Sequence, residues 1–265
     1  LVLSLRSPRN ARVLAELAAA EASLYEQGGL VTYTADRFLL DIFSDTTERT
    51  PTFALPPFRP ADDRTSRPSW AFAKHPGRPT KEAWHAMLRR APRGLAWESK
   101  DYKSMDAPQA LVDTPPILDE REIDRYLIGD EPDPGRFGDG GSLFIQVEVG
   151  GAPSAEGAAE PTPKPSTTHR RALLALAGSE AGAAATDSYE RVFALTLDLP
   201  PSPVYLWHHL AVKLVFNTVS TATMGMLGRI RGNWMIQVDP TNKKLIDRGS
   251  RIIAHLTGIP YEDAC

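Results

Sequence analysis

The chain has 265 residues, and its 30 Lys and Arg residues nearly balance its 33 Asp and Glu residues, for a formal net charge of -3. That balance excludes the strongly positive field that binders of nucleic acid and anionic membranes use. The single cysteine, Cys265, excludes internal disulfides and cysteine-rich metal sites. No apolar run approaches the roughly 20 residues that cross a bilayer. We expect a cytoplasmic protein that binds neither nucleic acid nor membrane and uses no metal or cofactor.

Helices and strands alternate from the start of the chain. The stretch NARVLAELAAAEASLYEQGG predicts a helix that starts near Ser7 or Asn10 and stops at Gly28. The residues LVTYT that follow are typical of a short buried strand. Next, DRFLLDIFSDTTE predicts a second helix, which Asp36 opens and Glu48 ends.

The alternation continues after a Pro-rich segment that we expect to be extended. SWAFAKH predicts a strand, and TKEAWHAMLRRA predicts a helix with Thr80 as its N-cap. LDEREIDRYLIGDE predicts a short helix that runs into a strand ending at Gly129 and Asp130, and SLFIQVEVG predicts a further strand. Residues of about 150–188 are rich in Ala, Gly, Pro, Ser and Thr, so we expect most of this tract to be disordered. RVFALTLDLP restores strand character before a long helix.

This order of elements predicts an α/β fold with a parallel sheet covered on both faces. Such folds place ligands beyond the carboxyl ends of their strands, here after LVTYT and after RVFALTLDLP. Backbone amides at the start of the second helix could attract an anion, but this turn is not glycine-rich and Asp36 would repel phosphate. His208 and His209 are adjacent and point in different directions, which argues against a metal site.

Two residues are candidates for binding or chemistry. Lys213 lies among apolar residues early in the long helix, where an ammonium is costly unless it meets an anion. Glu48 is expected at a helix C-terminus, which disfavours a carboxylate. The structural alternative is that Lys213 extends to solvent and Glu48 is a hydrated loop residue. From spacing alone, that alternative is favoured for both residues.

The stretch KLVFNTVSTATMGMLGRIRGNWMIQVDPTNKKL resembles a signature shared by the N-acetylmuramic acid 6-phosphate etherases and the glucokinase regulatory protein. ERTPTF resembles the E-C-P-P-T-F of the etherases, and RYLIGDEPD resembles a segment that follows it in the regulatory protein. The positions of the first stretch that fit the signature are Lys213, Asn217, Ser220, Thr221, Gly228, Asn233, Met235, Asn242 and Leu245.

The resemblance implies a sugar isomerase (SIS) domain, a three-layer flavodoxin-like α/β fold, over residues 1–204. Residues of about 56–106 are then a Pro- and Trp-rich insertion, which the etherases lack, and the low-complexity tract is a second one. Residues 205–265 comprise the long helix and the start of a C-terminal helical cap. The chain starts without Met and ends abruptly in YEDAC, so we expect a piece of a longer protein.

The resemblance also implies a phosphorylated sugar as ligand. Lys213 would contact its phosphate or hydroxyls, and Glu48, Asn217 and Ser220 would be the other binding residues. In the etherases, the residue that matches Glu48 is the proposed acid assisting departure of the lactyl ether, so Glu48 would be catalytic if this chain is a lyase. The polar residues of the long helix would thus face a ligand site and support its walls.

Two features of the etherases are missing. Their G-A-G-T-S-G-R phosphate loop is replaced by YTADRFLL, and their second glutamate, the proposed base of an E-G-A-E-D motif, has no counterpart. Both losses suit the second SIS domain of a glucokinase-regulator-like protein, which is the leading hypothesis. The partners it implies are another SIS domain, from the same chain or a second copy, and a sugar kinase. The alternatives are an etherase-like lyase completed by a missing half, and an SIS scaffold without ligand.

Overall fold

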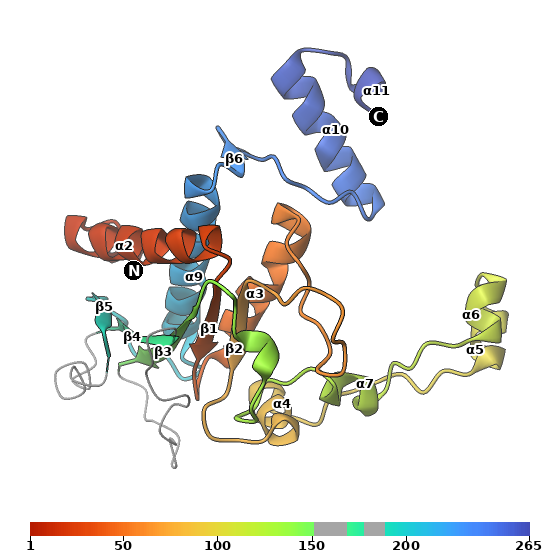
Figure 1. Ribbon diagram of the computed structural model, residues 1–265, viewed down its shortest axis with the longest axis horizontal. Coiled ribbons are helices and arrows are strands. Elements are labelled where there is room, and N and C mark those ends of the chain that lie inside the picture. Colours follow the sequence, from red (N-terminus) through yellow and green to blue (C-terminus); the bar gives the residue numbers. More distant parts are fainter. Residues whose placement is uncertain (151–168, 178–188) are drawn as a thin grey trace.

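The computed structural model of the protein describes residues 1–150, 169–177 and 189–265. A five-stranded sheet lies at its centre, in the order β2-β1-β3-β4-β5, and all neighbouring strands run parallel. Helices flank the sheet, so the predicted flavodoxin-like α/β class is confirmed (Figure 1). The strands are β1 (Leu30–Thr34), β2 (Ala71–Lys74), β3 (Ser142–Val149), β4 (His169–Leu176) and β5 (Arg191–Leu195).

β1 has no polar face because it is covered on both sides. All five of its residues are buried, and its neighbours β2 and β3 place Tyr33 between Ala73 and Ile145. A strand in the middle of a parallel sheet is shielded by other elements on each face, so its sequence does not alternate between apolar and polar residues. The stretch LVTYT follows that rule.

Three long helices form a layer against the sheet: α2 (Pro8–Glu26), α3 (Leu39–Phe53) and α9 (Leu206–Met226). α9 contacts both of the others, and its apolar face joins the same core as the strands. The ring of Phe216 in α9 packs edge-on against Tyr33 of β1, with 4.7 Å between centroids. The sheet and α9 therefore share one core across the expected division at residues 204 and 205.

The ends of α2 agree with the prediction, but those of α3 do not. Ser7 caps α2 by accepting a hydrogen bond from the Asn10 amide, and the helix ends at Glu26, just before Gly28 with φ of +78°. α3 begins at Leu39 rather than at Asp36, because the chain first passes through a left-handed residue, Phe38.

α3 also continues to Phe53, so the prediction that it ends at Glu48 was wrong. The obstacle to a longer helix was Pro51, but this proline lies in the last turn, where it interrupts few backbone hydrogen bonds. The hydroxyl of Thr52 also donates to the carbonyl of Glu48 across that turn. Glu48 is therefore a residue of the helix body.

α4 (Thr80–Leu88) begins as predicted, but Thr80 is its first residue and not its N-cap, which is Pro79. The Thr80 hydroxyl instead accepts hydrogen bonds from the amides of Ile128 and Gly129, at 3.2 and 3.1 Å. These two amides are thus bound to a side chain, and the Asp130 amide donates to the carbonyl of Arg78, so no strand forms at Gly129 and Asp130. The helix predicted before them is α7 (Glu120–Asp124).

Both expected insertions contain parts of the sheet or its cover. The segment of about 56–106 includes the edge strand β2, the helix α4 and the start of an arm that projects from the molecule (Figure 1). In the tract of about 150–188, residues 169–176 form β4 and are not disordered, whereas 151–168 and 178–188 lie outside the described residues. The apolar ALLAL of this tract pairs with β3 and β5.

The remaining elements are short or peripheral. After α9 the chain forms a small antiparallel hairpin and then α10 and α11, which extend away from the sheet (Figure 1). Within the described ranges, no helix combines the length and hydropathy that a membrane crossing requires. The short and peripheral elements are α1 (Val2–Leu5), α5 (Ser99–Ser104), α6 (Gln109–Asp113), the 3-10 helix η1 (Pro134–Arg136), β6 (Ile230–Arg231), β7 (Trp234–Met235), α10 (Lys243–Thr257) and α11 (Tyr261–Ala264).

Candidate functional site between α3, α9 and α10

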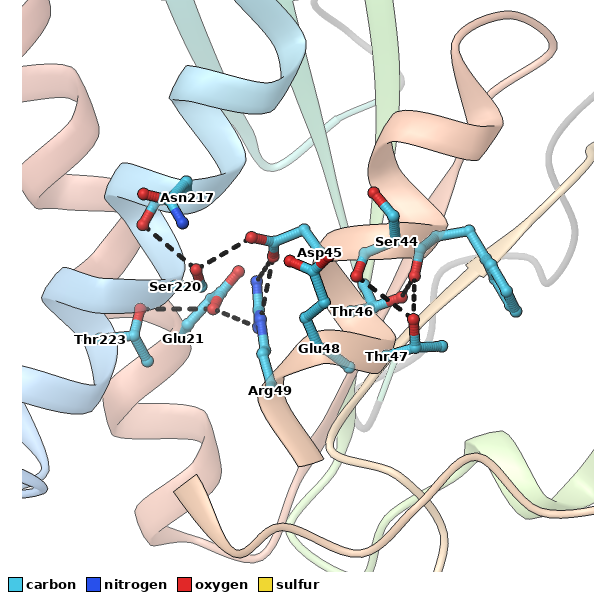
Figure 2. Close-up of polar contacts among 12 residues, drawn as sticks. Glu21, Ser44, Asp45, Thr46, Thr47, Glu48, Arg49, Asn217, Ser220 and Thr223 are labelled. Carbon is cyan, nitrogen blue, oxygen red and sulfur yellow. Dashed lines mark hydrogen bonds and ion pairs between the residues drawn. The ribbon is translucent and has the colours of Figure 1, made fainter. Parts of the chain in front are cut away.

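Polar side chains line the contact between α3 and α9. Residues three or four positions apart lie on one face of a helix, and the polar residues of these two helices have that spacing. We call this set of residues the polar seam, and Figure 2 shows the part of it around Asp45 and Arg49. Its members are Asp41, Ser44, Asp45, Glu48 and Arg49 of α3, and His209, Lys213, Ser220 and Thr223 of α9.

One part of the seam is closed to solvent. Arg49 is 3% exposed and lies between two buried carboxylates. Its Nε donates to Asp45 Oδ2 at 3.1 Å, and its Nη1 donates to Glu21 Oε2 of α2 at 3.3 Å. Figure 2 shows these three side chains directed toward one another between the helices. We call Glu21, Asp45 and Arg49 the buried charge cluster.

Hydroxyls of α9 complete this cluster. Ser220 Oγ donates to Asp45 Oδ1 at 3.1 Å, and Thr223 Oγ1 donates to Glu21 Oε2 at 3.3 Å. Both α9 residues are buried. A carboxylate that has left water needs donors of this kind, since an unpaired buried charge is very costly. Ser220 and Thr223 of α9 therefore have a structural role, because they donate hydrogen bonds to buried carboxylates.

The cluster also shifts the ionisation of its members. Burial raises the pKa of Glu21, and the positive charge of Arg49 offsets only part of that effect. Burial alone would lower the pKa of Arg49, but the charges around it, that of Glu21 foremost, raise it overall. The guanidinium therefore stays charged, and the raised pKa makes Glu21 easier to protonate than a carboxylate in water.

The other part of the seam is open to solvent. The side chain of Lys213 is 37% exposed and that of Glu48 is 71% exposed. Lys213 does not extend into solvent but points toward α3, where its Nζ donates to Ser44 Oγ at 2.7 Å and lies 3.9 Å from Glu48 Oε2. An ion pair as exposed as this one stabilises a fold very little, so both groups are free to exchange it for a ligand.

A pocket of about 360 Å³ opens beside this part, between α3, α9 and the start of α10. We call it the α3–α9–α10 pocket. Three of the four residues singled out from the sequence line it: Glu48, Asn217 and Ser220. Lys213 is not among its lining residues, although its ammonium lies next to Glu48. The complete lining is Asp45, Glu48, Arg49, Pro51, Thr52, Phe53, Asn217, Ser220, Thr221, Met235, Asn242, Lys244, Leu245 and Arg248.

Sequence reasoning missed the cations that line this pocket. Lys244 and Arg248, four positions apart on α10, bring two cations to its wall. The available signal was the helix start itself, because Asn242 caps α10 and its Oδ1 accepts a hydrogen bond from the Leu245 amide at 3.1 Å. That cap fixes the first turn and thereby the face on which both cations lie.

The arrangement suits a small polyol that carries a negative charge. Lys244 and Arg248 can attract an anionic group, while the amide of Asn217 and the hydroxyl of Thr221 can bind neutral hydroxyls. Glu48 supplies a carboxylate that can accept or donate a proton. Across the described part of the chain, no group of three or more His, Cys, Asp or Glu residues is placed to hold a metal ion.

No family model matches the chain. Part of it is similar to curated N-acetylmuramic acid 6-phosphate etherases. The protein from Geobacillus thermodenitrificans is 46% identical over 54 residues, which is 20% of this chain and 18% of that protein. Those from Microcystis aeruginosa and Bacillus cereus are 52% identical over 52 residues and 50% identical over 54 residues. The match thus spans less than a fifth of the length of each of these relatives.

Proposed function

We propose that the chain is an SIS-type domain that binds an amino-sugar phosphate of the N-acetylmuramic acid 6-phosphate kind in the α3–α9–α10 pocket. The observation that carries this proposal is the meeting of Glu48 with the two α10 cations and the polar residues of α9 in one pocket. The partial similarity to etherases supports the same ligand class. An anionic sugar needs both features, since cations bind its phosphate and neutral polar groups bind its hydroxyls.

The residues in and beside the pocket have separate roles in this proposal. Lys244 and Arg248 hold the phosphate, Asn217 binds a sugar hydroxyl, and Lys213 turns from Glu48 to the ligand. Ser220 already donates to Asp45 and contacts the carbonyl of Asn217. We therefore assign Ser220 to the wall of the pocket, where it holds the α3 carboxylate in place.

The comparisons favour the etherase alternative over the glucokinase-regulator hypothesis, because the three relatives named above are etherases. Elimination of a lactyl ether needs a base beside the carbonyl as well as an acid at the leaving oxygen. Glu48 can serve as one of them, but Asp45, the other carboxylate in the pocket, is bound to Arg49 and Ser220. In this proposal the second group comes from another SIS domain, either in the same protein or in a second copy.

Calorimetric titration of the protein with N-acetylmuramic acid 6-phosphate, fructose 6-phosphate and fructose 1-phosphate tests this function. We expect the amino-sugar phosphate to bind best, and Lys244→Met together with Arg248→Met to weaken it by at least tenfold, about 1.4 kcal/mol. The matched control is Lys103→Met on the arm helix α5, which should leave binding unchanged. Preference for a fructose phosphate would favour the regulator, and binding of none would favour the scaffold.

A lactate-release assay then separates a lyase from a binding domain. Release that stops in Glu48→Gln would assign Glu48 to the reaction. Tight binding without release would mean that the chain lacks the second proton-transferring group.

A further inference from the structure

A second cavity, of about 500 Å³, lies apart from the α3–α9–α10 pocket. It is formed by the turn after β1, the residue after β2, the end of α4 and the first turns of α3 and α9. This is the carboxyl edge of the sheet, where parallel α/β folds bind ligands. We call it the carboxyl-edge pocket. The lining residues that matter below are Asp36, Arg37, Phe38, His75, Arg89 and His209.

A histidine and a carboxylate form a close pair in this pocket. His209 Nδ1 lies 2.6 Å from Asp41 Oδ2, so the first turn of α9 is bonded to the first turn of α3. The Asp41 carboxylate accepts a hydrogen bond from Nδ1–H of His209. In the neutral ring, Nε2 then has a lone pair that can accept a hydrogen bond from a ligand. Over the described ranges no group hydrogen-bonds to that nitrogen, and the His209 side chain is 39% exposed.

The backbone around this pair is strained. Phe38 and Arg89, which line the pocket, have φ of +57° and +55°, and Tyr205, which precedes α9, has φ of +52°. Residues other than glycine rarely adopt this left-handed conformation, and it collects at ligand sites because the surrounding structure must enforce it. The guanidinium of Arg37 lies 5.4 Å from the ring of Phe38 and 4.8 Å from that of Tyr205, and so links two of the strained residues.

The charges of the pocket indicate the class of ligand. Arg37 and Arg89 are offset by Asp36 on the wall and by Asp41 behind His209. Burial, followed by the charge of Arg78, lowers the pKa of His75, so this ring stays neutral at pH 7. A balance of this kind suits a singly charged anion better than a dianion, which Asp36 would repel.

We propose that the carboxyl-edge pocket binds a small hydroxycarboxylate, with its carboxylate at Arg89 and its hydroxyl donating to Nε2 of His209. Asp41 is the positioning residue, because its hydrogen bond holds the ring in the tautomer that accepts at Nε2. This site is separate from the one proposed for the sugar phosphate and does not depend on it.

Nuclear magnetic resonance of the imidazole nitrogens tests the proposal in the intact protein. The chain has six histidines, so comparison with His209→Gln assigns the His209 signals. We expect glycolate to shift them saturably, and acetate, which lacks the hydroxyl, to bind about tenfold more weakly. The variant Lys244→Met should leave glycolate binding unchanged, which distinguishes failure of this proposal from failure of the sugar-phosphate site.

Three variants and one control variant give independent readings. His209→Gln should abolish the preference for glycolate over acetate, and Asp41→Asn should change the tautomer that the nitrogen shifts of His209 report. Arg89→Gln should weaken both ligands, whereas Arg90→Gln, its exposed neighbour outside the pocket lining, should not. Unsaturable shifts at His209, an unchanged preference in His209→Gln, or tighter binding of inorganic phosphate than of glycolate would overturn the proposal.

Discussion

The two parts of the polar seam contain similar residues in different surroundings. In the closed part, Arg49 meets Glu21 and Asp45 away from water, and a hydroxyl of α9 donates to each of the two carboxylates. In the open part, Lys213 meets Glu48 at the surface. Burial decides the consequence, because a buried charge that loses its partner is costly and an exposed one is rehydrated. The closed part therefore holds the helices together, and the open part is available to a ligand.

The largest expected effect comes from breaking the closed part. Arg49→Met removes a cation that pairs with two buried carboxylates, so we expect a loss of about 3–5 kcal/mol in the free energy of unfolding. Urea denaturation measures it. The control is Arg251→Met, since Arg251 pairs with Asp247 at the same i,i+4 spacing on the surface of α10. Equal denaturation midpoints for these two variants would mean that the buried charge cluster stabilises the fold no more than an exposed ion pair does.

The pH dependence of stability follows from Glu21. Burial raises its pKa above the ordinary value of 4.5, so between that value and the raised one the folded state keeps a proton that the unfolded state has released. The contribution of Glu21 to the free energy of unfolding is fully present below pH 4.5, and it is lost as the pH rises through the raised pKa. Glu21→Gln should remove that decline, while Glu16→Gln, exposed on the same helix, should preserve it.

A smaller effect is expected from the hydroxyls of α9. Thr223→Val keeps the shape of the side chain but removes a donor to Glu21, at a cost of about 1–2 kcal/mol. Thr218→Val, on the exposed face of α9, is the matched control and should leave the midpoint unchanged. Thermal unfolding of both variants checks the pair, and similar losses in the two would mean that the contact to Glu21 contributes nothing.

The smallest effect on stability should come from the open part. Glu48→Gln removes an ion pair whose carboxylate is 71% exposed, so the urea midpoint should not move measurably. Binding of the amino-sugar phosphate should nevertheless change, because Glu48 lines the pocket. A clear loss of stability without any change in binding would assign Glu48 to the structure.

The sequence allowed the fold class to be predicted because its strongest signals are local. β1 is a short apolar run bounded by Gly29, and α2 has a cap at Ser7 and a stop at Gly28, so each could be recognised without its neighbours. β4 was lost in a low-complexity tract, because its apolar residues gain meaning only when they pair with β3 and β5. The end of α3 was misplaced because Pro51 is tolerated in a last turn.

The candidate site was predictable only in part. Lys213 and Glu48 were candidates from their charge and surroundings, and the resemblance assigned them, with Asn217 and Ser220, to a ligand site. The structure places Lys213, Glu48 and Ser220 in the polar seam and Asn217 in the lining of the adjacent pocket. The spacing of residues within α9 does not predict that Ser220 meets a buried carboxylate while Lys213 reaches the surface. That difference depends on how closely α3 packs against α9 at each position. The cations of α10 reach the pocket through tertiary packing, which no local pattern reports.

The most direct test of the account is calorimetric titration of the protein and its Lys213→Met variant with N-acetylmuramic acid 6-phosphate. We predict affinity at least tenfold weaker in the variant, about 1.4 kcal/mol, with an unchanged urea midpoint, as expected of an open-part residue that binds ligand. Unchanged affinity, or a lowered midpoint that accounts for the loss, would contradict it and make Lys213 a structural residue like those of the closed part.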